Sequence, residues 1–256
     1  MTTGLVSPKC YAAGFQDCDG RPASREHWIS RALLKRMQFG GTGLRVGGLS
    51  WVEGERESRI SELTTRMLCA RHNSMLHTLD DAATALHDAW LTVAERNETY
   101  LGLSGDLLER WAVKVLVGMI VSGAARVDGI AVRTQPPQAV LDVLFGLRDL
   151  SSPRGFYFVI HEEHDGGLKI KVNTAPRGHE LEGIAFGITI QFLAFRFMTW
   201  LHRLPPEHKS LIYRPAGFDF AGLGRIDLEW SKGAANPAVP LDLKVKARPE
   251  ESTGAE

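Results

Sequence analysis

Three cysteines and one histidine constrain this chain more than any other feature of its sequence. Cys10 and Cys18 lie close together near the N-terminus, and Cys69 opens the segment Cys69-Ala70-Arg71-His72. An odd number of cysteines in a chain with no visible secretory signal argues against a disulfide framework. Three thiolates and one imidazole make a complete tetrahedral donor set for zinc. We therefore expect Cys10, Cys18, Cys69 and His72 to bind one structural zinc ion, the alternative being buried thiols beside an unrelated histidine.

The composition is that of an ordinary globular protein. Of 256 residues, 44% are apolar and 23% are charged, and 30 basic residues balance 30 acidic ones. Balanced charge excludes a polybasic coat for nucleic acids but allows a local basic patch. The most apolar stretch, Ile184 to Leu201, contains Gln191 and Arg196, which disfavours a membrane helix. The N-terminus lacks a charged and apolar signal region, so we expect a cytoplasmic chain without a membrane partner.

Apolar spacing predicts the elements of the N-terminal part. A short helix is expected from about His27 to Gln38, followed by a strand from Leu44 to Val52 that two glycines weaken. Glu53 to Arg59 is expected to be a charged turn, and Ile60 to Leu68 fits a strand or a helix equally well. After Cys69, an i, i+3, i+4 stripe of apolar residues predicts one long amphipathic helix.

Polar residues and prolines indicate where helices begin and end in the rest of the chain. On the helix after Cys69 we expect His77 to be a solvated surface histidine and Asp80 to be a cap or turn residue. Asp106-Leu107-Leu108-Glu109 has the spacing of a capping box and predicts a helix that ends near Gly123. Pro136-Pro137 predicts the start of a further helix.

Strand signals dominate beyond residue 153. Phe156 to Ile160 and Leu168 to Val172 flank Asp165-Gly166-Gly167, which predicts a hairpin. A later apolar alternation changes phase near Leu193 to Phe195, which predicts a bulge or a turn. Phe218 to Trp230 predicts one more strand or hairpin.

Three segments resemble the HNH, or His-metal-finger, nuclease superfamily. Residues 10–18 with Ser24-Arg25-Glu26-His27-Trp28-Ile29-Ser30 resemble its acid–His–hydrophobic block after a cysteine pair. Ile60-Ser61-Glu62-Leu63-Thr64 stands in the place of the second block. Leu68-Cys69-Ala70-Arg71-His72-Asn73 and the residues up to Asp80 resemble uncharacterised bacterial HNH-like proteins with a Cys-x2-His-Asn block. The resemblance covers roughly residues 9 to 98.

The resemblance implies a metal-dependent nucleic-acid phosphodiesterase, with DNA favoured over RNA as the substrate. His27 matches the general base that activates water, a role that suits an imidazole because its pKa lies near neutrality. Glu26 and Asn73 match the ligands of a catalytic Mg²⁺ or Mn²⁺, ions that prefer oxygen donors. The three cysteines and His72 match the structural zinc positions.

The expected fold is α+β, in two domains. The resemblance implies the first domain, and the helix and strand signals predict the second. Residues 1–98 would form a zinc-stapled treble-clef or ββα domain like those of HNH nucleases. Residues 99–245 would form an α+β domain with helices first and antiparallel strands after them, which would bind substrate or a partner or mediate self-association. The charged tail, residues 246–256, is expected to be disordered.

Two features favour a second hypothesis, a catalytically decayed zinc-binding module that binds nucleic acid or protein. No asparagine stands near Thr64, where the family has its middle one, and the net charge is zero. Against this, the chain keeps Glu26-His27 and Asn73, and from Arg25 to Arg71 nine basic residues outnumber five acidic ones. That excess is a modest footprint for phosphates.

Overall fold

The computed structural model describes most of the chain: residues 10–15, 18, 21–38, 44–47, 55–127, 130–131, 133–160, 168–174, 185–193, 195–203, 206 and 210–241. The fold is mixed α+β with antiparallel sheets, and the candidate zinc ligands lie together near the N-terminus. The expected α+β class is thus confirmed. The expected disordered tail and the turn at residues 165–167 lie outside the described residues.

A ribbon of two antiparallel strands, followed by helices, forms the N-terminal part. Its elements are β1 (Ser24–His27), α1 (Arg31–Met37), a 3₁₀ turn (Ile60–Glu62), β4 (Thr64–Leu68), α2 (Ala70–Met75) and α3 (His77–Arg96). β1 pairs with β4, and His27 lies opposite Thr64. The helix expected to start near His27 therefore begins at Arg31, where Ser30 Oγ accepts a hydrogen bond from Leu33 N over 3.4 Å and caps the first turn.

Two further expectations for this part are refined. The segment from Ile60 to Leu68, which fitted a strand or a helix, contains the 3₁₀ turn and then β4. The single helix expected after Cys69 is divided at Leu76, whose side chain is buried and whose amide still bonds to the Asn73 carbonyl over 3.0 Å. The apolar stripe does not reveal this break because Leu76 continues the stripe.

A seven-stranded sheet forms the middle of the molecule. In spatial order it contains β12 (Leu211–Tyr213), β8 (Gly155–Val159), β11 (Phe195–Trp200), β10 (Ala185–Phe192), β9 (Leu168–Thr174), β2 (Leu44–Gly47) and β3 (Glu55–Ser58). Only β2 and β9 run parallel among these described pairs. The hairpin expected to join β8 and β9 is wrong, because β11 and β10 lie between them. The charged turn expected at residues 53–59 is also wrong, since β3 pairs with β2.

Two hairpins agree with the sequence signals. The change of phase near Leu193 is the turn between β10 and β11, where Phe192 pairs with Phe195 and Leu193 has a φ of 52°. The expected strand or hairpin from Phe218 to Trp230 is a hairpin of β13 (Gly217–Phe220) and β14 (Gly224–Glu229). These turns were predictable because each interrupts a local alternation.

The next helices are α4 (Gly105–Ser122) and α5 (Gln138–Leu144). α4 ends at Gly123, as expected, with the left-handed φ of 76° that glycine adopts without strain. The capping box is wrong: Ser104 Oγ caps the helix by accepting from Leu107 N over 3.2 Å. Asp106 instead accepts from the amide of Ser231. No helix in the described part of the chain is both long and apolar enough to span a membrane.

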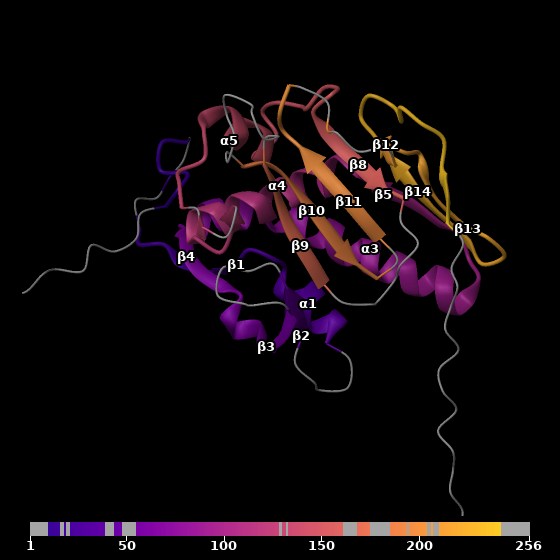
Figure 1. Cartoon of the computed structure of the whole chain (residues 1–256), viewed down its shortest axis with the longest axis horizontal. Helices are drawn as coiled ribbons and strands as arrows, with labels where there is room; N and C mark the ends of the chain where they lie inside the picture. The colour runs from indigo at the N-terminus through magenta and orange to yellow at the C-terminus, as the bar shows by residue number, and fades with distance from the viewer. Residues whose placement is uncertain are drawn as a thin grey trace, which may run out of the picture.

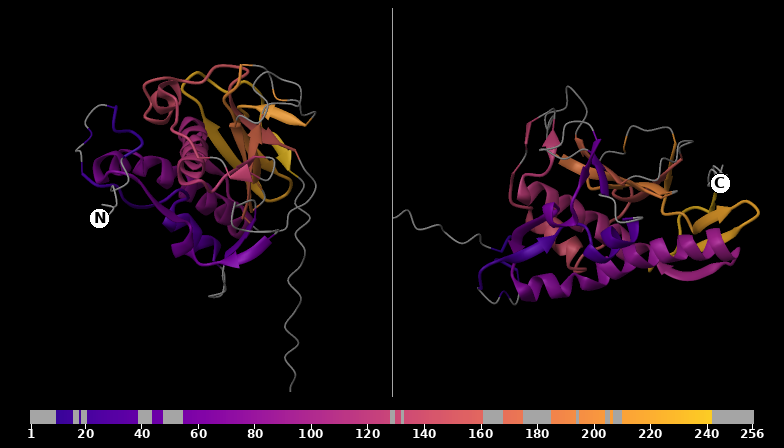
Figure 2. Two further views of the ribbon diagram at one scale, coloured as in Figure 1. Left: turned by 60° about the vertical axis from the view of Figure 1, so that its left-hand side comes forward. Right: turned by 90° about the horizontal axis from the view of Figure 1, so that it is seen from below.

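The long helices lie on one side of the large sheet (Figures 1 and 2). Trp111 of α4 contacts Phe192 and Phe197 of that sheet, with ring centroids 6.1 and 6.0 Å apart. The remaining strands are β5 (Tyr100–Ser104), β15 (Val239–Leu241), β6 (Arg126–Val127) and β7 (Ile130–Ala131). β5 joins β13, β14 and β15 in a second sheet.

One buried core connects the two expected domains. It runs from Cys10 to Leu241 and includes residues on both sides of the expected boundary at residue 98. The two regions approach each other closely at Gly118 of α4, where a Cβ atom would lie 2.5 Å from the Cβ of Trp28. α4 thereby brings the second region against the N-terminal ribbon.

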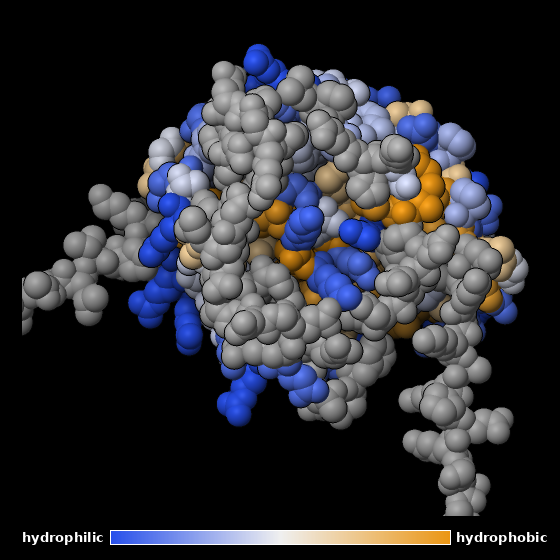
Figure 3. Space-filling view, viewed as in Figure 1, coloured by the Kyte–Doolittle hydropathy of each residue, from blue (hydrophilic) through white to orange (hydrophobic). Residues whose placement is uncertain are grey.

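A second apolar cluster lies on the other face of the sheet. It consists of Tyr157, Val159, Met198 and Trp200, with Phe186, Leu211 and Tyr213 packed against them. Figure 3 views the molecule from this side and shows apolar surface toward the right. Self-association through this region stays a prediction.

Candidate functional site

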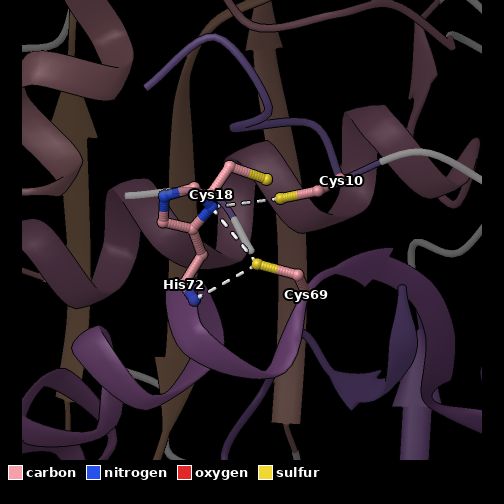
Figure 4. A group of neighbouring side chains, drawn as sticks. All are labelled: Cys10, Cys18, Cys69 and His72. Carbon is pink, nitrogen blue, oxygen red and sulfur yellow. Dashed lines mark hydrogen bonds between the residues drawn. The ribbon is translucent and has the colours of Figure 1, made fainter. Parts of the chain in front are cut away.

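The four predicted zinc ligands converge in space. One sulfur or nitrogen atom from each of Cys10, Cys18, Cys69 and His72 lies within 4.8 Å of all the others (Figure 4). The Cys10 and Cys69 sulfurs lie 3.2 and 3.5 Å from His72 Nδ1. In a tetrahedral zinc site, ligand atoms about 2.0 to 2.3 Å from the ion are about 3.3 to 3.8 Å apart. The four residues could therefore hold a metal ion, and the donor set is consistent with zinc.

Local structure explains how residues so far apart in sequence meet. β4 ends at Leu68, and Cys69 is the N-cap of α2, which places His72 in the first turn beside the Cys69 sulfur. The N-terminal segment is held against β4 by a 2.9 Å hydrogen bond from Tyr11 N to Met67 O. This bond fixes the neighbouring Cys10 beside the helix start.

The cluster is dry. Cys10, Cys69 and His72 are at most 6% exposed, and the rings of Phe15 and Phe145 pack around the His72 imidazole with centroids 6.1 and 5.4 Å away. Burial raises the pKa of the Cys10 thiol to about 11. Buried thiolates need a cation, so this environment suits a closed structural metal site.

A polar hollow of about 380 Å³ lies beside the ribbon and contains the three predicted catalytic residues. Its lining, which we call the carboxylate hollow, consists of Glu26, His27, Ser30, Arg31, Ala32, Lys35, Asn73, His77, Asp80 and Asp81. Strand β1 supplies Glu26 and His27, and α2 supplies Asn73. Asn73 directly follows His72, and adjacent helix residues point about 100° apart. One turn of α2 thus contributes His72 to the cluster and Asn73 to the hollow.

His27 has the chemical state that a general base requires. Burial lowers the pKa of its imidazole, and the nearby Arg31 charge lowers it further. The Ile60 backbone opposes part of this lowering of the pKa, and the buried Nε2 of the ring has no hydrogen-bond partner among the described residues. A buried polar atom without a partner carries a free-energy cost.

A second hollow of about 310 Å³ adjoins His27. We call it the basic hollow; its lining consists of Arg25, His27, Arg31, Lys35, Gln38, Ile60, Ser61 and Thr64. Side chains alternate between the two faces of a strand, so Arg25 and His27 point away from Glu26. His27, Arg31 and Lys35 line both hollows. The imidazole therefore borders one hollow whose lining includes carboxylates and another whose charged lining residues are all cations.

Two buried charges meet at the edge of the carboxylate hollow. Lys114 of α4 is 2% exposed, and its Nζ lies 2.6 Å from Asp80 Oδ2. Burial raises the pKa of Asp80, and the Lys114 charge opposes that rise. Asp80 Oδ1 is buried without a partner among the described residues. Burial likewise raises the pKa of Glu26, whose carboxylate contacts the Ser24 hydroxyl.

The sequence reasoning missed several of these residues. Asp80 was expected to be a cap or turn residue, yet it lies in the first turn of α3 and forms a largely buried ion pair. His77 is exposed, as expected, with 73% of its side chain accessible. A signal for Lys114 was present, because it is one lysine within the apolar run Val113 to Val117. Arg31 and Lys35 were among the nine basic residues counted from Arg25 to Arg71, but the sequence did not indicate that they lie beside His27.

Comparisons with known proteins give no family for this chain. No protein-family model matches it, and neither a search of curated proteins nor a search of solved structures found a match. The geometry of the two sites is therefore what indicates a function for this chain.

Proposed function

We propose that this chain is a metal-dependent nucleic-acid phosphodiesterase of the HNH type, acting on DNA in preference to RNA. The observation that carries the proposal is the position of His27 between the carboxylate hollow and the basic hollow. Hydrolysis of a phosphodiester needs a base beside the phosphorus, a cation near the leaving oxygen and positive charge along the backbone. The two hollows offer groups suited to these needs around one imidazole.

The order of elements supports the HNH resemblance. Glu26 and His27 lie at the end of the first strand of an antiparallel pair, and Asn73 lies in the helix after the second strand. A strand pair followed by a helix supports the ββα arrangement that the resemblance implies, with α1, β2 and β3 between the two strands along the chain. Thr64 faces His27 across the ribbon and stands where the family has its middle asparagine.

Each residue has a distinct role in the proposed reaction. His27, which lines both hollows, would accept a proton from the attacking water. Glu26 and Asn73 offer oxygen ligands for Mg²⁺ or Mn²⁺ on the other side of the imidazole. A divalent cation bound there would supply positive charge to the scissile phosphate.

In this proposal the Cys/His cluster holds zinc and has no part in catalysis. Its four donors are fully occupied by one tetrahedral ion, which leaves no open position for substrate. Its role is to fix the start of α2, and with it Asn73, against the ribbon. A small ββα unit gains folding free energy from such an ion.

A second candidate function, the catalytically decayed zinc-binding module, has one observation in its favour. The Lys114 ammonium already neutralises Asp80, and its charge also acts on Glu26. A fixed cation beside the carboxylates weakens their attraction for a metal ion. This candidate predicts that nucleic acid or protein binds without being cleaved.

A plasmid-nicking assay separates the two candidates. Wild-type protein with Mg²⁺ or Mn²⁺ should nick supercoiled plasmid, and His27→Ala should reduce the rate by roughly 10²- to 10⁴-fold, the usual contribution of a general base. His77→Ala removes an exposed imidazole from the same hollow and is the matched control, with a rate close to that of wild type. Equal nicking by wild type and His27→Ala, at unchanged zinc content, would remove His27 from the mechanism. Binding without nicking would favour the decayed module.

A further inference from the structure

Three cationic side chains line the basic hollow. Arg25, Arg31 and Lys35 are exposed and line it together, and among its described lining residues there is no carboxylate. None of the three forms an ion pair with a carboxylate in the described part of the chain. Neighbouring like charges repel, and a bound polyanion relieves that repulsion.

α1 fixes two of these cations side by side. Arg31 and Lys35 are four residues apart, so they lie on the same face of the helix. The opposite face is anchored, because Leu33, Leu34 and Met37 are buried in the core. The two side chains therefore project from a fixed helix over His27, and both line the carboxylate hollow as well as the basic one.

Arg36, the next residue on α1, has a different environment. Its guanidinium makes two hydrogen bonds to the Asp88 carboxylate of α3, 2.8 and 3.2 Å long. It does not line either hollow, and its charge is already neutralised. The same short helix thus carries two cations without an acidic partner and one with such a partner.

We propose that the basic hollow is the subsite for the nucleic-acid phosphate next to the scissile one, with Arg31 and Lys35 as its contacts. This deepens the proposed function and rests on it. The backbone would run from the carboxylate hollow, across His27, into the basic hollow. Arg31 and Lys35 would contact phosphates on both sides of the imidazole, since they line both hollows. Gln38, Ser61 and Thr64 add neutral polar groups to the subsite.

The test measures binding without cleavage. The full chain is titrated with a fluorescent DNA duplex of about 20 base pairs, without added Mg²⁺ or Mn²⁺, over a series of salt concentrations. The variants are Arg31→Gln, Lys35→Gln and the control Arg36→Gln, each of which removes one positive charge from α1. We expect the first two to weaken binding by roughly tenfold each and to reduce the salt slope by about one unit each. Arg36→Gln should keep the wild-type slope.

The outcomes separate this subsite from the proposed function. If the wild type binds DNA but all three variants have the same salt slope as the wild type, the subsite assignment is wrong while the nuclease proposal stands. If the wild type does not bind the duplex at all, the proposed function itself fails. Inorganic phosphate, added at constant ionic strength, should compete only weakly. Displacement of the duplex by low phosphate concentrations would overturn a nucleic-acid subsite in favour of a small phosphate ligand.

Discussion

The Cys/His cluster and the carboxylate hollow use adjacent residues of one helix, His72 and Asn73, yet they differ in almost every physical property. The cluster is closed, with His72 fully buried and aromatic rings around it. The hollow is open and polar, and it contains a buried nitrogen and a buried carboxylate oxygen without described partners. A site whose four ligand atoms all bind one metal ion stabilises a fold. A site whose polar groups lack hydrogen-bond partners is suited to binding a ligand.

The comparison also separates residues that set position from residues that would react. The cluster fixes the N-terminus of α2 beside β1 and leaves Asn73 facing the hollow. The second region contributes to both sites, since Phe145 at the end of α5 packs against His72 and Lys114 of α4 reaches Asp80. Substitutions in the two sites should therefore affect different measurements.

The largest effect is expected from Cys69→Ser, a test of the closed site. Serine is a preferred N-cap, so this change keeps the cap of α2 and removes only the thiolate. Structural zinc supplies folding free energy directly, so zinc should be lost and the N-terminal part should unfold. Elemental analysis and thermal unfolding measure both. Ser74→Ala, at an exposed position of α2, is the control and should leave zinc content unchanged. If wild-type protein purified without a chelator contains no zinc, the assignment is wrong.

Asn73→Ala tests whether the adjacent residue belongs to the other site. Loss of a metal ligand should reduce nicking by roughly 100-fold while the zinc content stays at that of wild type. Asn73→His should restore much of the rate, because an imidazole can also bind a divalent metal ion. If Asn73→Ala releases zinc, the two sites are not independent and the contrast between them fails.

Lys114→Met tests the link between the second region and the open hollow. It leaves the Asp80 carboxylate largely buried without its partner, which should reduce the free energy of unfolding by about 3 kcal/mol. Adding Asp80→Asn removes the uncompensated charge and should recover part of that loss. Urea unfolding of the two variants measures the difference. Equal stability of the wild type and Lys114→Met would show that this ion pair does not hold the regions together.

The smallest effect concerns the pH dependence of nicking. The rate should rise with pH as the His27 imidazole loses its proton, and this limb should lie below the usual histidine range because burial and Arg31 lower the pKa. Arg31→Gln removes one of the two causes and should move the limb to higher pH. A pH profile of kcat/KM for both proteins measures the shift. A limb that moves to lower pH would exclude His27 as the titrating base.

Local patterns in the sequence determined a definite part of this protein. The α+β class, the end of α4 at Gly123 and the turn at Leu193 follow from periodicity and turn chemistry. The donor set of the cluster follows from ligand chemistry, because three thiols and one spaced histidine suit a single tetrahedral ion. Such features are carried by neighbouring residues or by the residue types themselves.

Only the tertiary structure decided which distant segments meet. Glu109 looked like half of a capping box, but it is buried against Arg214, 105 residues later, with a 2.8 Å bond between their charged groups. β8 and β9 looked like a hairpin, but two later strands separate them. Lys114 stood out within its apolar run, but only the packing of α4 against α3 decided that its partner is Asp80. The physical reason is that local spacing specifies which face of an element is apolar, while the partner of that face depends on packing of the whole chain.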